Sequence, residues 1–443
     1  GINYWNNTQL ENDMKFNAIV GNPPYQFSVG KENVNYAIPI FGKFVDIAKT
    51  LKPSYLSMIM PSRWFTGGRG LDEFRHSMLN DEKIAYIHDF VESSDCFPHV
   101  DIAGGICFFL WDEKHKGLCD FTSEHLGVRS TRKRKLNEFK FGDYEFFIRR
   151  NEALNIVNKV IAADEEKMSS TVSKQTPFGF ITTFKGQPKE FPGALKLLGS
   201  YNEVTFVTRD EVTRNPGWID KYKVIFTMAA PGGGGSDKNG QYSLLSSLQV
   251  IKPKEICTQT FLVGNTFDNE KEAYNCVSYL STRFVRFLIL QTMTSQHLGA
   301  EKFTFVPIVD WTKDWSDFEL YSKYGLTAEE IKYVESTIKP LDSPTLFSSD
   351  EILDPSFGNF NLFEYGVKVG DTIVYTPTNT ALTVAEGNMV EYGGEKYTLA
   401  QFTTKYMPRN KRSASGVCQG PKYFSYKGVT LYKLKESFLG GQK

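Results

Sequence analysis

Short apolar runs alternate with amphipathic stretches along the N-terminal part of the chain. The runs are rich in β-branched and aromatic residues, and the stretches place apolar residues three and four positions apart, as helices with one buried face do. Strands that alternate with helices are typical of an α/β sheet. We therefore expect strands at 16–20, 55–60, 84–90 and 102–110, and helices at 40–51 and 71–79.

Beyond about residue 166 the alternation gives way to short strands and turns, followed by longer amphipathic helices. Asn269 and Glu272 have the spacing of a helix capping box. This region predicts an α+β unit. Its expected elements are strands at 178–183 and 222–227, one long helix at 269–290, and a helix between Thr327 and Pro340.

A Ser/Pro-rich break at 343–349 precedes a last, smaller unit. Its expected elements are strands at 372–375, 390–395 and 426–433, and a helix at 399–407. A chain of 443 residues is long enough for several domains, each with its own core. The predicted domains are an α/β unit at 1–125, a basic linker and helix at 126–165, an α+β unit at 166–342, and a small α+β unit at 343–443.

The overall composition excludes several classes of protein. Lys plus Arg and Asp plus Glu number 51 each, so the net charge is zero and only local clustering of charge can indicate a partner. The six cysteines and six histidines are scattered without metal-ligand spacing, which predicts reduced thiols and no metal site. No apolar run approaches the ~20 residues that a membrane helix needs, so we expect no membrane partner.

The tetrapeptide Asn22, Pro23, Pro24 and Tyr25 follows the first predicted strand. Ligands of open α/β sheets bind beyond the carboxyl ends of the strands, where this segment would lie. One ligand whose chemistry would use these residues is an adenine base. Its amino group is a poor nucleophile, because its lone pair is delocalised into the ring. The Asn22 side-chain oxygen and the Pro23 carbonyl could each accept one amino hydrogen, while the prolines fix the backbone. Tyr25 offers a flat face for a stacked base. The alternative is a turn that ends a strand, with Tyr25 packed against the domain.

This tetrapeptide after a strand resembles the catalytic motif of the amino-methyltransferases that use S-adenosylmethionine. Further segments resemble type II restriction–modification adenine methylases in the same order, specifically over about residues 14–112 and more loosely as far as 326. In this family an aromatic residue before a proline forms the second wall of the base pocket, a role that the resemblance gives to Phe97. Ordinary core packing of Phe97 is an equal alternative. The matching segments are 61–65, 67–75, 95–98 and 102–105, then 279–284, 303–307 and 320–326.

The resemblance implies a partial Rossmann-like methyltransferase sheet, a target-recognition domain and a small C-terminal domain. It also implies site-specific adenine-N6 methylation of double-stranded DNA, with S-adenosylmethionine as the methyl donor, in the cytoplasm of a bacterium or archaeon. Asn22, Pro23, Pro24 and Tyr25 would be catalytic, and Tyr25 and Phe97 would stack on the flipped base.

The chain departs from the family pattern before Asn22. The family binds its donor with a Gly-rich loop and an acidic residue, and neither occurs upstream of the motif. The glycines at 232–235 indicate a loop tip instead. We therefore expect a fragment that is inactive alone, with the missing N-terminal half of the enzyme as a partner. The open edge of the strand at 16–20 would be covered by N-terminal residues such as Tyr4 and Trp5, by a second copy, or by distortion.

The most concentrated charge of the chain consists of Arg129, Arg132, Lys133, Arg134 and Lys135. Such a run is often a solvated linker. Beside a base-flipping site, contact with DNA phosphates is the favoured interpretation.

Two other functions remain open. The chain could be a DNA-specificity module without catalysis, although the intact motif at Asn22 argues against this. It could instead methylate a protein glutamine or RNA, since the same tetrapeptide serves those amino groups. The roughly 300 residues after the catalytic part argue against the second alternative.

Overall fold

The computed structural model describes residues 16–28, 37–66, 70–341 and 362–431, with gaps inside these ranges. The gaps are residues 101, 142–143, 201–202, 231–234, 246, 294–296, 377, 379 and 407–422. Of the residues that earlier expectations concern, Tyr4, Trp5, 67–69 and most of the glycine run at 232–235 lie outside the described residues. In the described part of the chain, no helix has both the length and the apolar character to cross a membrane.

A six-stranded mixed sheet forms the N-terminal unit, with the order β1-β4-β6-β5-β7-β8. β1 pairs with β4 and β5 pairs with β7 in parallel, whereas β6 runs antiparallel to both of its neighbours. The strands β1, β4, β5 and β7 therefore all point in one direction, and their carboxyl ends share one edge of the sheet. The bounds are β1 Ala18–Gly21, β4 Tyr55–Pro61, β5 Ile84–Phe90, β6 Ile106–Asp112, β7 Cys119–His125 and β8 Val128–Arg134.

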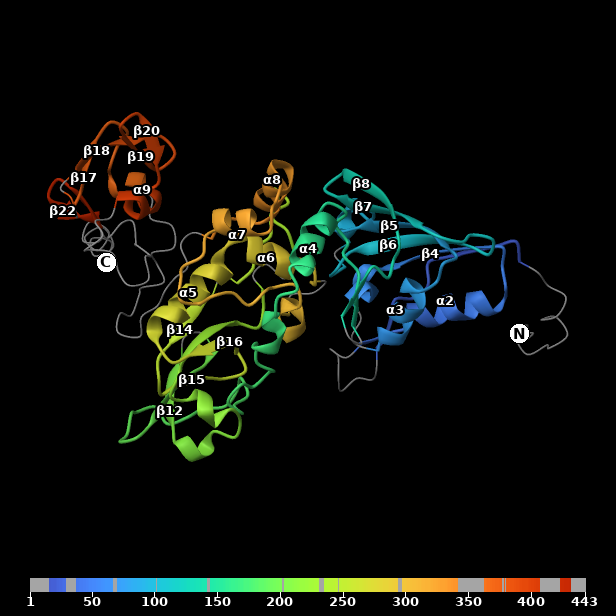
Figure 1. The fold of residues 1–443 in the computed structure, drawn as a ribbon, viewed down its shortest axis with the longest axis horizontal. Helices are drawn as coiled ribbons and strands as arrows, with labels where there is room; N and C mark the ends of the chain where they lie inside the picture. The colour runs from blue at the N-terminus through green and yellow to red at the C-terminus, as the bar shows by residue number, and fades with distance from the viewer. Residues whose placement is uncertain are drawn as a thin grey trace.

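Two helices, α2 (Phe41–Thr50) and α3 (Asp72–Leu79), lie on the same side of this sheet (Figure 1). Phe41, Val45 and Ala48 recur at helical spacing and are buried against the sheet. The helices and the strands β4 and β5 confirm the sequence expectation closely.

The other predicted elements of this unit are displaced. The strand expected at 102–110 begins only at Ile106, because Gly104 and Gly105 adopt φ values of 90° and 81° that turn the chain. β1 lies at the edge of the sheet, where an open edge was expected, and Val20 is 80% exposed. Among the described residues, no strand pairs with the outer edge of β1.

The basic run is a strand rather than the expected linker. Its residues form most of β8, which pairs antiparallel with β7 over its whole length. Successive side chains of a strand point to opposite faces, so the run cannot present all its cations to one partner. Arg134 lies on the inner face and is 2% exposed.

The second unit is built around a core that runs from Phe139 to Ile338, so the segment 139–160 packs with it. A second cluster, from Phe178 to Val263, lies beside this core. The strand expected at 222–227 is confirmed as β13, whereas 178–183 form turns. The strands are β9 Phe139–Phe141, β10 Tyr144–Phe146, β11 Leu195–Leu198, β12 Val204–Val207, β13 Tyr222–Thr227, β14 Gln249–Ile251, β15 Glu255–Cys257 and β16 Phe261–Phe267.

The long helix expected at 269–290 is two helices. Asn269 caps the first as expected, accepting a hydrogen bond from the Glu272 amide at 2.9 Å. Thr282 has an extended ψ of 149° and caps the second, so the chain changes direction there. The helices of this unit are α4 Ala153–Ala162, α5 Glu270–Ser281, α6 Arg283–Leu290, α7 Asp317–Lys323 and α8 Ala328–Thr337.

The third unit is a sheet with the order β20-β19-β18-β17-β21-β22, against which α9 (Leu399–Tyr406) packs. The strand expected at 390–395 is a hairpin instead, because Gly393 and Gly394 turn the chain at positive φ. The strands are β17 Thr372–Tyr375, β18 Thr380–Ala385, β19 Met389–Tyr392, β20 Glu395–Tyr397, β21 Phe424–Tyr426 and β22 Val429–Thr430.

Candidate active site

Three loops at the carboxyl ends of β1, β4 and β5 line one cleft of about 920 Å³. The lining residues extend from Asn22 to Ala103 along the chain, and the parallel direction of the three strands brings their loops together. The sequence-predicted residues Asn22 to Tyr25 and Phe97 all line this cleft. The lining residues are Asn22, Pro23, Pro24, Tyr25, Gln26, Pro39, Phe41, Pro61, Arg63, Phe97, Val100, Ile102 and Ala103.

The segment after β1 presents Asn22 to the cleft. Pro23 is buried, Asn22 is exposed, and the Tyr25 carbonyl accepts a hydrogen bond from the Ile40 amide at 3.2 Å. This bond continues the β2–β3 hairpin (Gln26–Ser28 and Ala37–Pro39), which fixes the end of the motif. Within the described residues, the Asn22 side chain has no hydrogen-bond partner, so its oxygen remains available as an acceptor.

Tyr25 lies in the same wall of the cleft. Its hydroxyl is buried and has no hydrogen-bond partner among the described residues. Burial raises the pKa of Tyr25, and the nearby Cys96 and Cys107 thiols raise it further. The Tyr25 side chain is therefore uncharged near pH 7.

The opposite wall is the loop between β5 and β6. Phe97 is half-buried, and its amide donates to the Ser93 carbonyl at 2.8 Å. The Ser93 hydroxyl donates to the Val100 carbonyl at 2.7 Å and accepts from the Ile102 amide at 2.8 Å. A single buried hydroxyl thus holds both sides of the loop that presents Phe97.

A buried ion pair supports the base of this loop. The Arg149 guanidinium donates to both carboxylate oxygens of Asp89 at 2.7 and 2.8 Å, and the Ser62 hydroxyl donates to the same carboxylate at 2.6 Å. Burial lowers the pKa of Arg149, but the charge and the hydrogen bonds of Asp89, with smaller contributions from Tyr242 and Cys107, together raise it by more, and the arginine stays charged. A Cβ on Gly105 would lie 2.2 Å from the Phe90 carbonyl and 2.8 Å from the Arg149 guanidinium. Only glycine fits at this point.

Arg63 is a cleft residue to which the sequence analysis assigned no role. It is the charged member of the lining set among the described residues, and it follows β4 in the short helix η2 (Ser62–Thr66). Arg63 could have been identified as a site residue from the sequence, because it lies within the matching segment 61–65, directly after a predicted strand.

The basic strand contributes no residue to the cleft lining. Arg134 is unsuited to contact DNA, because its guanidinium lies over the Phe147 ring at 4.6 Å and donates to the Ile148 carbonyl at 2.8 Å. Burial lowers the pKa of Arg134 to about 10. We therefore remove Arg134 from the expected phosphate contacts.

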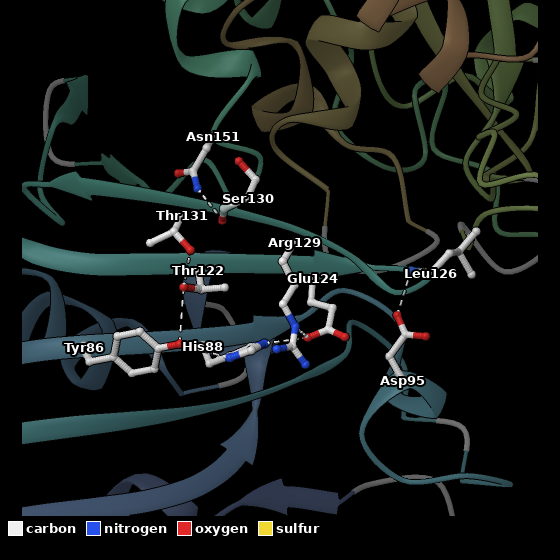
Figure 2. A network of polar contacts seen from close by, with 10 residues as sticks. All are labelled: Tyr86, His88, Asp95, Thr122, Glu124, Leu126, Arg129, Ser130, Thr131 and Asn151. Carbon is white, nitrogen blue, oxygen red and sulfur yellow. Dashed lines mark hydrogen bonds and ion pairs between the residues drawn. The ribbon is translucent and has the colours of Figure 1, made fainter.

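Two of the remaining cations already face carboxylates. Arg129 donates to Glu124 at 2.7 Å, and Glu124 also contacts His88 at 2.8 Å (Figure 2). Lys133 lies 3.8 Å from Asp120.

Arg132 and Lys135 are exposed cations without an acidic partner among the described residues. They are the members of the run that are left to meet an external anion. In the described part of the chain, no group of three potential metal ligands occurs.

The mixed sheet, with its cleft beyond the carboxyl ends of parallel strands, defines an α/β protein. Residues 2–97 match the Eco57I restriction-modification methylase family. A segment of 106 residues is 42% identical to an uncharacterized adenine-specific methylase of Mycoplasma pneumoniae, covering 24% of this chain and 25% of that protein. The N-terminal part of the chain is thus similar to restriction–modification methylases, which confirms the resemblance that the motifs indicated.

Two solved structures are similar at low identity. The type IIG restriction endonuclease BpuSI is 11% identical with a TM-score of 0.32, over 72% of this chain and 48% of that one. The type IIL restriction-modification enzyme MmeI, solved in complex with DNA, is 9% identical with a TM-score of 0.36, over 64% of this chain and 45% of that one. The chain thus spans about a quarter of the methylase relative and less than half of either enzyme.

Proposed function

We propose that this chain supplies the base-binding cleft of a site-specific DNA adenine-N6 methyltransferase of a restriction–modification system. The family match and the adenine-specific relative support DNA methylation in general. The observation that carries the finer proposal is the cleft that joins Asn22–Tyr25 to Phe97. Two aromatic rings and a free amide oxygen are what a flipped adenine requires.

In this proposal the motif prepares the adenine amino group. The Asn22 side-chain oxygen and the Pro23 carbonyl each accept one N6 hydrogen, and the nitrogen becomes more nearly tetrahedral. Its lone pair is then free to attack, with the geometry held by the two prolines. Tyr25 and Phe97 stack on the base, which contributes about 1–3 kcal/mol per aromatic contact.

The described residues fit the base better than the methyl donor. S-adenosylmethionine supplies an electrophilic methyl group in this family. Among the described residues, no cluster of glycines lies between a parallel strand and a following helix, the place where the family binds its donor. We therefore assign no donor contact to residues of this chain.

Double-stranded DNA is the proposed substrate, and its backbone would meet Arg132 of β8 and Lys135, which follows the strand directly. Both are exposed, whereas Arg129 and Lys133 face carboxylates that reduce their attraction for phosphate. Phosphate contacts of this kind contribute affinity without sequence preference.

The experiment that tests the proposal is Asn22→Ala in the full-length enzyme. Methyl incorporation into duplex DNA should be lost, while the Kd for specific DNA stays within about tenfold, because the motif acts on the amino group in the transition state. Asn158→Ala is a matched control, because Asn158 is exposed on α4, away from the cleft.

Methylation by the Asn22 variant near the wild-type rate would contradict the mechanism. If the wild-type enzyme methylated an RNA or a glutamine peptide but not duplex DNA, the substrate of the site would be that amino group and not adenine in DNA.

A further inference from the structure

A turn of the second unit meets the loop that forms the Phe97 wall. The Ser236 hydroxyl donates to the Glu92 carboxylate at 2.9 Å, and the Ser236 amide lies 3.5 Å from the same oxygen. Glu92 follows β5 directly after Val91 and begins the loop that leads through the short helix η3 (Ser93–Asp95) to Phe97. The contact therefore joins residues 144 positions apart.

His125, the last residue of β7, completes the contact. Its Nε2 atom lies 3.1 Å from the Ser236 hydroxyl and 3.7 Å from the Glu92 carboxylate. Tyr242 stacks on the imidazole with ring centroids 5.8 Å apart. Since the Ser236 hydroxyl gives its hydrogen to Glu92, its lone pairs are free to accept one from His125. The three side chains form a short chain of hydrogen bonds.

A second tether acts on the same loop. Asp95 accepts a hydrogen bond from the Leu126 amide at 2.8 Å, in the turn between β7 and β8 (Figure 2). The turn that follows Ser236 packs on this β-turn, since a Cβ on Gly240 would lie 3.1 Å from Leu126 and 3.3 Å from His125. The segment 92–95, two residues before Phe97, is thus held by both units.

The electrostatics suit a fixed carboxylate at Glu92. Burial raises the pKa of Glu92, but the nearby His125 and the hydrogen bonds from Ser236 together lower it by more, and the net pKa lies below the ordinary value. Glu92 is therefore an acceptor at neutral pH. Loss of the Ser236 hydroxyl would leave a half-buried carboxylate short of a donor, which is unfavourable.

We propose that Ser236, Glu92 and His125 form a positioning junction, through which the second unit sets the place of the Phe97 wall against the flipped base. The inference rests on the proposed function, and it makes these three residues positioning residues that do not touch the base. DNA bound by the second unit would then meet a Phe97 wall whose position the same unit fixes.

The test is Ser236→Ala in the full-length enzyme, with Ser236→Thr as the conservative rescue. Ser247→Ala is the matched control, because Ser247 is a partly buried serine of the same unit that bonds Thr227, away from the cleft. At saturating DNA, Ser236→Ala should lower the single-turnover methylation rate by about tenfold or more, the effect of one lost hydrogen bond to a charged group. The DNA Kd should change by less than about threefold, and Ser236→Thr should recover most of the rate.

Emission of 2-aminopurine at the target position separates positioning from chemistry. Ser236→Ala should change this emission in the bound complex, because the extruded base loses a fixed stacking partner. Equal rates and emission for Ser236→Ala and wild type would overturn the junction. A DNA Kd that weakens as much as the rate would overturn it as well.

Failure of the proposed function can be distinguished from failure of the junction, because in that case the wild-type enzyme itself would methylate no duplex DNA. The junction is still measured in that case by hydrogen exchange. Ser236→Ala should speed exchange of the amides at 93–100, and Ser247→Ala should not. Unchanged exchange in Ser236→Ala would count against the junction whatever the enzyme methylates.

Discussion

Replacement of Asp89 by alanine should destabilise the N-terminal unit severely. Asp89 is fully buried and receives three hydrogen bonds, two from Arg149 and one from Ser62. The alanine variant would leave a guanidinium that is 6% exposed without its counter-charge. It would also leave the Ser62 hydroxyl without its acceptor.

The expected loss is about 3–5 kcal/mol, the usual effect of removing one partner of a buried ion pair. Each hydrogen bond to a charged group is worth ~1.5–3 kcal/mol, so a simple sum over three bonds would exceed this range. We use the lower figure because the bonds share one carboxylate and their contributions are not additive.

Hydrogen exchange during urea unfolding is the suitable assay, because a chain with several cores does not unfold in one step. Peptides from β5 and β6 report the unit concerned. Asp220→Ala is the matched control, since Asp220 makes an equally bidentate pair with Arg209 but at the surface, where little change is expected.

The double variant Asp89→Leu with Arg149→Met should recover much of the lost stability, because it removes the unpaired charge as well. Destabilisation of β5 and β6 by less than ~1 kcal/mol in Asp89→Ala would refute the reasoning.

Three further predictions concern other sites. Gly105→Ala should lower stability by at least ~2 kcal/mol and disturb the cleft wall, since its φ is 81° and its Cβ would meet the Phe90 carbonyl; near-normal thermal unfolding would contradict this. Charge reversal of Arg132 and Lys135 should weaken binding to all duplexes alike and flatten its salt dependence, as DNA titrations at several salt concentrations would show; a loss confined to one sequence would mean that they read bases. Burial lowers the pKa of Lys223 to about 8 from 10.5. Between these two pKa values only the unfolded chain binds the Lys223 proton, so Lys223 should contribute a rise in stability with pH of up to ~1.4 kcal/mol per unit, measured as the difference in slope between wild type and Lys223→Met in urea unfolding.

The sequence predicted one wall of the candidate site well. Asn22 follows an apolar strand, and ligand sites of α/β sheets lie at such points, so the local pattern was enough. Phe97 could be assigned only through the family resemblance, because nothing local shows that β5 runs parallel to β1. The cleft lining includes it.

The misjudged elements have two physical causes, which are tertiary pairing for β8 and local capping or turn geometry for the others. The cations of β8 look like a solvated linker along the chain, and only pairing with β7 shows that Arg134 points inward. Thr282 sits within an unbroken helical pattern, yet its side chain caps a second helix. Gly104 and Gly105 were included in a strand although they turn the chain before Ile106.

The loop that carries Phe97 is braced by its own hydrogen bonds, which affects the thermodynamics of base capture in the proposed function. Extruding a base from a duplex requires a few kcal/mol for lost pairing and stacking. Enzymes that must also order a loop lose additional conformational entropy at that moment. Here the Ser93 hydroxyl already bridges the backbone at Val100 and Ile102. If the chain captures a base as proposed, ordering of this loop should add little to the unfavourable free energy, and a duplex whose target adenine is already mispaired should bind more tightly than a matched duplex.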